Sequence, residues 1–157
     1  MSGNRASVLG RIPPALWFFA LLFAGWGLDR LVPLPIPFPA FAWQLGPALG
    51  LFAAAALFAG WAIRLFAVKR TSLLPFSRAS ALLDTGPFRV SRNPLYVALV
   101  ATLGAFGLLL ASCWLLIAAA LLALALDRFV IPAEEAALAE AFGERYAAYA
   151  RRVRRWL

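Results

Sequence analysis

The sequence contains no histidine, one cysteine and few charged residues. Without histidine the chain cannot form a histidine-box di-iron centre, a histidine-ligated zinc or haem site, or a catalytic triad with a histidine base. A single cysteine, Cys113, excludes an intramolecular disulfide and a multi-cysteine metal site. We therefore expect no metal, and any chemistry must use arginine, carboxylate, tyrosine, asparagine and backbone groups.

The apolar content is far above that of a soluble domain. Hydrophobic residues make up 64% of the 157 residues and charged residues 14%, whereas soluble domains carry about 25% charged residues. A soluble domain of this size leaves much of its surface in water and could not hide so much apolar surface. The sequence therefore predicts an integral membrane protein, with a single membrane domain over residues 1–157.

The charged residues are unbalanced in sign. The chain has 15 basic and 7 acidic side chains, for a net charge of +8. In a mostly apolar chain, this excess favours an anionic membrane surface or an anionic ligand over nucleic acid.

Apolar segments predict an all-α protein with about four membrane-spanning helices. These segments cover residues 12–30, 46–67, 94–111 and 113–131. Between the first two, a proline at every second position from Pro33 to Pro39 predicts an extended outer loop. Residues 93–126 carry no charge, and a single helix of that length would extend about 51 Å, past a hydrocarbon core of about 30 Å. We therefore expect a tight helical hairpin that turns near Ala111 and Ser112.

Two polar segments remain, a basic loop over residues 68–93 and a tail over residues 132–157. In the tail, apolar residues recur at helical spacing, which predicts a C-terminal amphipathic helical segment with a kink or break at Gly143. These residues are Leu138, Phe142, Tyr146, Tyr149, Val153 and Trp156. In the four-span topology, 14 of the 15 basic residues lie on one side and only Arg30 lies on the other. The positive-inside rule therefore predicts a multi-pass membrane protein with both termini in the cytoplasm, and we expect the membrane to be a bacterial inner membrane.

The segment from Gly86 to Tyr96 combines turn signals with arginines. Gly86-Pro87 predicts a turn, Asn93 is a favourable helix N-cap, and Pro94 suits the first helical position. A helix N-terminus beside arginine side chains is well suited to bind a carboxylate or a phosphate. The competing interpretation is that these arginines only anchor the chain at the cytoplasmic surface.

Glu134 and Glu135 directly follow the last predicted span. The topology returns them to the same face as Arg92 and Tyr96, and acidic side chains near the membrane plane are costly unless they have partners. Arg128 and the basic loop are candidate partners. Carboxylates suit a ribose diol or an ammonium group, although a water-facing pair at a helix start is the simpler interpretation.

Two ordered motifs separated by a hairpin resemble a known family. The first is Gly-Pro-Phe-Arg-Val-Ser-Arg-Asn-Pro-Leu-Tyr at residues 86–96, and the second is Glu-Glu-x-x-Leu-x-x-x-Phe-Gly-x-x-Tyr-x-x-Tyr-x-x-x-Val at residues 134–153. Over residues 70–157, the chain resembles the C-terminal half of the isoprenylcysteine carboxyl methyltransferase and phospholipid methyltransferase superfamily. The resemblance implies an integral-membrane methyltransferase that uses S-adenosylmethionine, with its cofactor site on the cytoplasmic side.

Carried over position by position, the resemblance implies roles for particular residues. The cofactor-binding residues are then Arg92, Asn93, Pro94, Tyr96, Glu134, Glu135 and Tyr146, of which Arg92 and Glu135 are also catalytic. Asn93 stands where many members have histidine, and asparagine can hydrogen-bond a cofactor but cannot act as an acid or base near pH 7. Methyl transfer tolerates this change, because positioning supplies most of the catalysis.

We expect Arg92 to bind the methionyl carboxylate, Glu134 or Glu135 to bind the ribose or amino group, and Tyr96 to contact the adenine or the sulfonium. The acceptor is a membrane lipid or lipophilic small molecule bearing a carboxylate, amine or thiol, which enters laterally between helices. Two other functions stay open. One is an NADPH-dependent membrane reductase of the sterol-reductase type, and the other is a non-catalytic lipid-binding membrane protein.

Overall fold

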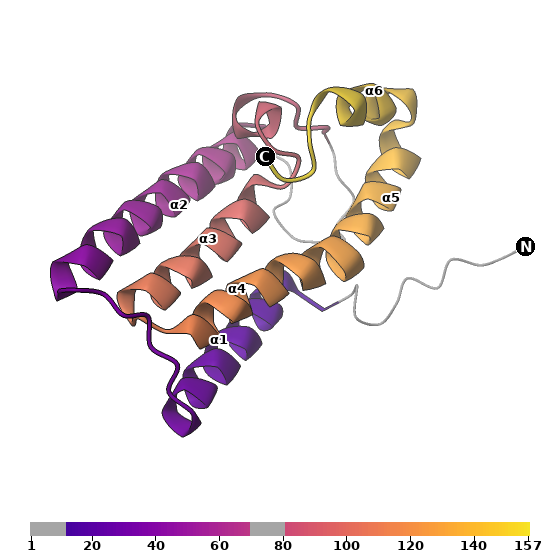
Figure 1. Ribbon diagram of the computed structural model, residues 1–157. Helices are drawn as coiled ribbons and strands as arrows, with labels where there is room; N and C mark the ends of the chain where they lie inside the picture. The colour runs from indigo at the N-terminus through magenta and orange to yellow at the C-terminus, as the bar shows by residue number, and fades with distance from the viewer. Residues whose placement is uncertain (1–11, 70–80) are drawn as a thin grey trace, which may run out of the picture.

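The computed structural model describes residues 12–69 and 81–157, and these residues form helices joined by turns and short non-helical segments (Figure 1). The α-helices are α1 (Pro14–Leu31), α2 (Phe41–Lys69), α3 (Pro94–Leu109), α4 (Cys113–Ala125), α5 (Ile131–Phe142) and α6 (Glu144–Arg152). A 3₁₀ turn, η2 (Gly86–Arg89), precedes α3, and a π-helical turn, η3 (Leu126–Val130), joins α4 to α5.

Four helices pack side by side. Helix α3 lies between α2 and α4, and α1 packs against the other side of α4 (Figure 1). Close packing depends on small residues: the buried positions of α2 are Ala48, Ala55 and Ala62, at seven-residue spacing. Such small side chains let helices approach closely in a membrane, where packing rather than water exclusion drives association.

Two helices of the described residues are long and apolar enough to cross a membrane. They are α2 and the continuous helix Cys113–Phe142, whereas α3 is a shorter apolar helix. Large apolar side chains such as Leu57 and Trp61 project from α2 and are at least half exposed. A lipid environment accounts for this exposure, because soluble proteins rarely expose extended apolar surface to water. The expected four-span topology remains a prediction.

The end of the molecule opposite α6 is closed by the proline-rich segment, residues 32–40. Helices α3 and α4 meet at a turn over residues 110–112, where the sequence predicted one, and Ala111 takes a φ of 49°. The proline-rich segment is extended and pairs with this turn, since the Ile36 N–H donates to the Ala111 carbonyl at 2.7 Å. Ser112 also donates to the Asp29 carboxylate at 2.7 Å, which ties the turn to α1.

Two helix boundaries differ from the sequence-based expectation. Helix α2 begins at Phe41 rather than near residue 46, and it contains Pro47 in its second turn. The last predicted span does not end before Pro132 but continues through η3 into α5. The π-helical turn, in which the Ile131 N–H donates to the Leu126 carbonyl, accommodates the proline, because it relieves the clash that a proline ring makes with the preceding helical turn.

The tail folds back onto the helices. Gly143 has a φ of 53° and separates α5 from α6, at the position where the sequence predicted a kink or break. Tyr146 and Tyr149 are buried in a cluster with Phe88 and Ala62. The predicted helical stripe is wrong at its end: α6 stops at Arg152, and Val153 is extended. Trp156 nevertheless packs against the core cluster of α3 and α4, so the chain end returns across the molecule.

Candidate functional site

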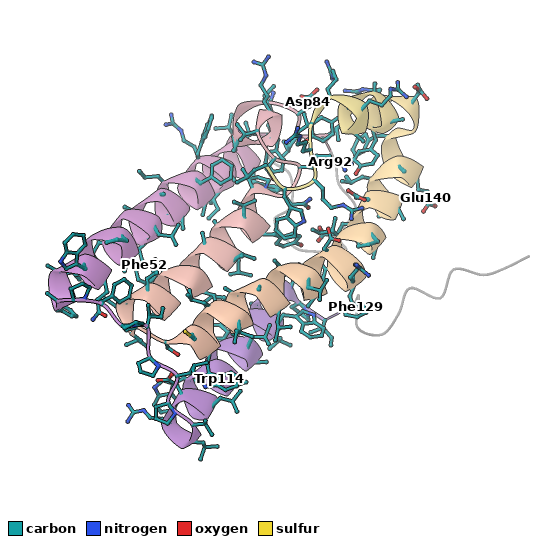
Figure 2. All side chains as sticks on the ribbon, viewed as in Figure 1. Phe52, Asp84, Arg92, Trp114, Phe129 and Glu140 are labelled. Carbon is teal, nitrogen blue, oxygen red and sulfur yellow. The ribbon has the colours of Figure 1, made fainter. Side chains whose placement is uncertain are left out.

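The start of α3, the beginning of α5 and the chain end meet at one end of the molecule (Figure 1). Figure 2 labels Arg92, which lies in the segment before α3 and faces the side of α5 and α6. The topology predicted from the sequence put the glutamates on the same face of the membrane as Arg92 and Tyr96, and side-chain contacts join these segments.

Arg92 is at the centre of this cluster. Its Nη1 lies 3.2 Å from Glu135 Oε1 and donates to the Tyr146 hydroxyl at 3.4 Å. The side chain is only 16% exposed. Its Nε is buried and has no hydrogen-bond partner among the residues that the structure describes. A buried N–H of a guanidinium group is costly to leave unpaired, so this atom is suited to receive an anionic ligand.

Tyr96 and Glu134 form a second pair. The Tyr96 hydroxyl donates to Glu134 Oε1 at 2.6 Å, which joins the first turn of α3 to the first turn of α5. Both side chains are half-buried. Arg128 was expected as a partner of the glutamates, and this expectation is wrong. Its Nε lies 3.9 Å from Asp127 Oδ2, and its side chain is 70% exposed.

Asn93 and Pro94 shape the start of α3. Pro94 is buried at the first helical position, as expected. Asn93 occupies the N-cap position, but its side chain makes no capping bond, so that interpretation of the side chain is wrong. Its Nδ2 donates instead to the Arg155 carbonyl at 2.9 Å, and the hydroxyl of the fully buried Ser91 donates to the same oxygen at 3.2 Å. Asn93 therefore binds the chain end directly.

Two residues of this cluster were missed by the sequence analysis. Arg155 binds Glu135 through two bonds, Nη2 to Oε2 at 2.6 Å and Nε to Oε1 at 3.2 Å. Its Nη1 also binds Asp127 Oδ1 at 3.1 Å, and the Trp156 indole N–H donates to that oxygen at 3.0 Å. Asp127 could have been found, because an acidic residue inside an apolar segment needs a partner. Arg155 carried no such signal, because the predicted amphipathic helix continued to Trp156 and its apolar stripe did not include Arg155.

Protonation states follow from these contacts. Burial, and secondly the nearby Glu135 carboxylate, raise the pKa of Tyr146. The hydrogen bond to Glu135 is the largest cause that raises the pKa of Arg155. Near neutral pH, Tyr146 is therefore a hydroxyl and Arg155 a cation, and both can donate hydrogen bonds in the cluster.

A cavity of about 550 Å³ lies beside the polar cluster. It opens between the start of α1, the middle of α2 and the first three turns of α3, and its lining is largely apolar. Lining residues include Ala55, Ala56 and Ala59 of α2 and Leu95, Tyr96 and Leu99 of α3. Tyr96 therefore both borders the cavity and contacts Glu134 through its hydroxyl.

Within residues 12–69 and 81–157, no group of three or more histidine, cysteine, aspartate or glutamate side chains is placed to hold a metal ion.

The long apolar helices point to a membrane protein, which carries a cluster of arginine and glutamate side chains at one end of its helices, beside an apolar cavity. The sequence model of one family, described as phospholipid methyltransferase, matches residues 43–145. The chain belongs to the phospholipid methyltransferase family, and this membership suggests a membrane methyltransferase. The match includes the start of α3 and both glutamates but ends before Tyr146 and the chain end. No curated protein and no solved structure matches the chain.

Proposed function

We propose that the protein transfers a methyl group from S-adenosylmethionine to a lipophilic acceptor in the membrane. The observation that carries this proposal is the buried Nε of Arg92, which lies in a cluster with two glutamates and two tyrosines. The family assignment, which rests on residues 43–145, points to the same activity.

The residues of the cluster suit this cofactor. Its methionyl part carries a carboxylate, which fits the buried Nε of Arg92. Its ammonium group and ribose diol fit the carboxylates of Glu134 and Glu135. When bound, the cofactor supplies an electrophilic methyl group on a cationic sulfur, and the Tyr96 ring is suited to contact a cation.

The chain's own residues contribute positioning rather than acid–base chemistry. Glu135 orients the guanidinium of Arg92, and Tyr96 holds Glu134 through a 2.6 Å hydrogen bond. Pro94 fixes the direction in which α3 begins. Asn93 was expected to bind the cofactor, but its amide is engaged with the Arg155 carbonyl, so we assign it to holding the chain end. Positioning of this kind can supply much of the rate of a displacement at a methyl group.

The cavity supports an acceptor with an aliphatic chain. Its lining is mostly apolar, and it lies between helices of the apolar bundle, so a lipid tail can enter it from the bilayer. Its wall includes Tyr96, whose hydroxyl faces Glu134. The reactive group of the acceptor, a carboxylate, amine or thiol, would then lie beside the polar cluster.

The arrangement of basic residues supports the four-span topology with both termini in the cytoplasm. Lys69 ends α2, and Arg89 lies in η2, which packs against α2 at the end of the bundle that holds Arg92. Arg30 lies in the last turn of α1, beside the proline-rich segment at the opposite end. We propose that the polar cluster faces the cytoplasm of a bacterial cell, where the cofactor is made available in water.

Ligand binding by the purified protein in detergent tests this function. We expect S-adenosylhomocysteine to raise the thermal unfolding midpoint in a saturable way and NADPH to leave it unchanged. A ligand that binds only the folded state adds about 2.7 kcal/mol at a hundredfold excess over Kd. Arg92→Ala should weaken S-adenosylhomocysteine binding by more than tenfold. Arg89→Ala, which removes an exposed arginine three residues away, should bind like the wild type.

Each other outcome selects a different function. Stabilisation by NADPH alone would favour the membrane reductase. A flat response to both ligands, with the protein folded, would favour the non-catalytic lipid-binding protein. Equal loss of affinity in both arginine variants would assign the response to the net charge of the surface rather than to the cluster around Arg92.

A further inference from the structure

The chain end, residues 153–157, is held against the start of α3 by that helix's own motif. Ser91 and Asn93 both donate to the Arg155 carbonyl, and the Arg92 N–H donates to the Arg154 carbonyl at 3.0 Å. Trp156 packs against the core and donates to Asp127. Backbone and side-chain contacts together thus fix the position of the residue between them, Arg155.

Arg155 and Arg92 hold the same carboxylate from two directions. Glu135 Oε1 lies 3.2 Å from Arg92 Nη1, and Glu135 Oε2 lies 2.6 Å from Arg155 Nη2. Asp127 holds the other side of the Arg155 guanidinium at 3.1 Å. Arg155 binds both Glu135 oxygens, through Nη2 to Oε2 and Nε to Oε1. Glu135 therefore contacts Arg92 through Oε1 and a single nitrogen rather than through the two-point fork that arginine and carboxylate prefer.

This arrangement leaves the buried Nε of Arg92 without a hydrogen-bond partner among the described residues. If Arg155 were absent, Glu135 could turn and bind Arg92 through both oxygens, and one of them would satisfy the Nε atom. A cofactor carboxylate would then have to displace an internal ion pair before it could bind.

We infer that Arg155 is a positioning residue of the cofactor site, which holds Glu135 away from Arg92 Nε, and that the chain end is therefore part of the site. This inference rests on the proposed function, because it concerns how the same site receives the cofactor. It adds to that function a residue that lies beyond the part of the chain matched by the family, residues 43–145.

A double-mutant cycle between Arg155 and Glu135 tests the inference, with the Kd for S-adenosylhomocysteine as the readout. We expect Arg155→Ala to raise this Kd at least tenfold, whereas Arg152→Ala, at an exposed arginine of α6, should change it less than twofold. In an Glu135→Gln background, Arg155→Ala should change the Kd less than twofold, because the carboxylate that Arg155 holds is already absent. A merely structural role of Arg155 would give the same loss in both backgrounds and would overturn the inference.

Arg155→Lys separates positioning from charge. Lysine keeps the positive charge but lacks the planar fork that reaches both Glu135 and Asp127, so it should recover at most part of the affinity. Full recovery would assign the effect to charge alone and overturn the inference. If Arg155→Ala does not fold, Asp127→Asn replaces it in the cycle: a rise in Kd of at least threefold that disappears with Glu135→Gln supports the inference, and an unchanged Kd overturns it. A wild-type protein that does not bind S-adenosylhomocysteine would instead contradict the proposed function.

Discussion

At the residue scale, each carboxylate of the polar cluster is bound by a donor from another segment of the chain. Glu134 is bound by Tyr96, Glu135 by Arg92 and Arg155, and Asp127 by Arg155. Acidic side chains near a membrane are costly unless they are paired, and each of these carboxylates has a donor from another segment. The same contacts therefore stabilise the fold and set the directions in which the site's donors point.

The buried Tyr149 makes stability sensitive to alkaline pH. Tyr149 is 3% exposed and donates to the Phe88 carbonyl at 2.8 Å, and burial raises its pKa. The folded protein thus holds this proton more tightly than the unfolded chain, whose tyrosine pKa is about 10. Its contribution to the free energy of unfolding is complete below about pH 10 and is lost as the pH rises further.

We expect the thermal unfolding midpoint of the wild type to decrease as the pH rises above about 10, because tyrosines of the unfolded chain ionise there while Tyr149 in the folded protein keeps its proton. At pH 8, Tyr149→Phe should have a free energy of unfolding about 1 kcal/mol lower than the wild type, because it lacks the hydrogen bond. Its unfolding midpoint should then fall less steeply as the pH rises. The pKa of Tyr146 is also raised, so this variant should still lose some stability at alkaline pH. Parallel pH curves for the two proteins would contradict the assignment to Tyr149.

At the scale of elements, the contact between α3 and α4 depends on the absence of a side chain at one position. A Cβ atom on Gly107 would lie 2.6 Å from Leu116 Cδ2 and 3.0 Å from the Leu116 backbone nitrogen. The Leu116 side chain can rotate, but the backbone of α4 cannot move without disturbing the buried Leu115 and Leu122 beside it. The hairpin is therefore tight because glycine allows its two helices to touch.

Gly107→Ala should lower the free energy of unfolding by about 1–3 kcal/mol, the usual cost of overpacking. Gly104→Ala is a matched control in the same helix, since its added Cβ would have its nearest neighbour, Leu51 Cδ2, at 3.8 Å. Alanine is the better helix former by about 1 kcal/mol, so this control should be neutral or more stable. Denaturant or thermal unfolding in detergent measures both, and equal stability of the two variants would contradict the close contact.

The α4–α5 helix is the second element on which the site depends. Its π-helical turn, residues 126–130, allows one helix to pass from the apolar bundle to the polar cluster without ending at Pro132. Asp127 lies in this turn, and Glu134 and Glu135 lie in the helix that follows. One continuous helix therefore carries all the carboxylates that face Arg155 and Tyr96.

At the scale of the whole molecule, the polar cluster and the proline-rich segment lie at opposite ends of the helices (Figure 1). Exposed arginines surround the cluster end, and Arg128 and Arg89 are among them. By the positive-inside rule, this distribution of charge predicts that the basic end faces the cytoplasm.

Cysteine labelling in intact cells tests the orientation. In a Cys113→Ala background, a cysteine at Ile36 should react with a membrane-impermeant reagent added outside, and a cysteine at Leu157 should react only after the membrane is opened. Labelling of residue 157 from outside would contradict both the orientation and the proposed access of the cofactor from the cytoplasm.

Local patterns of the sequence were sufficient for the membrane class, the helical hairpin and most of the candidate site. Apolar content and run length depend on composition alone, and Arg92, Tyr96, Glu134 and Glu135 could be recognised from two short motifs. The family match confirms the resemblance on which these assignments were based. Their roles in binding remain predictions.

Tertiary structure alone decided which partners those residues meet. The Asn93 amide could cap its own helix or bind elsewhere, and only the position of the chain end selects the Arg155 carbonyl. Arg155 had no helical period to follow, because the chain beyond Arg152 is not helical and is held by hydrogen bonds to residues more than 60 positions away. Side-chain periodicity records which face of a helix is buried, but it carries no information on contacts that a non-helical segment makes across the fold.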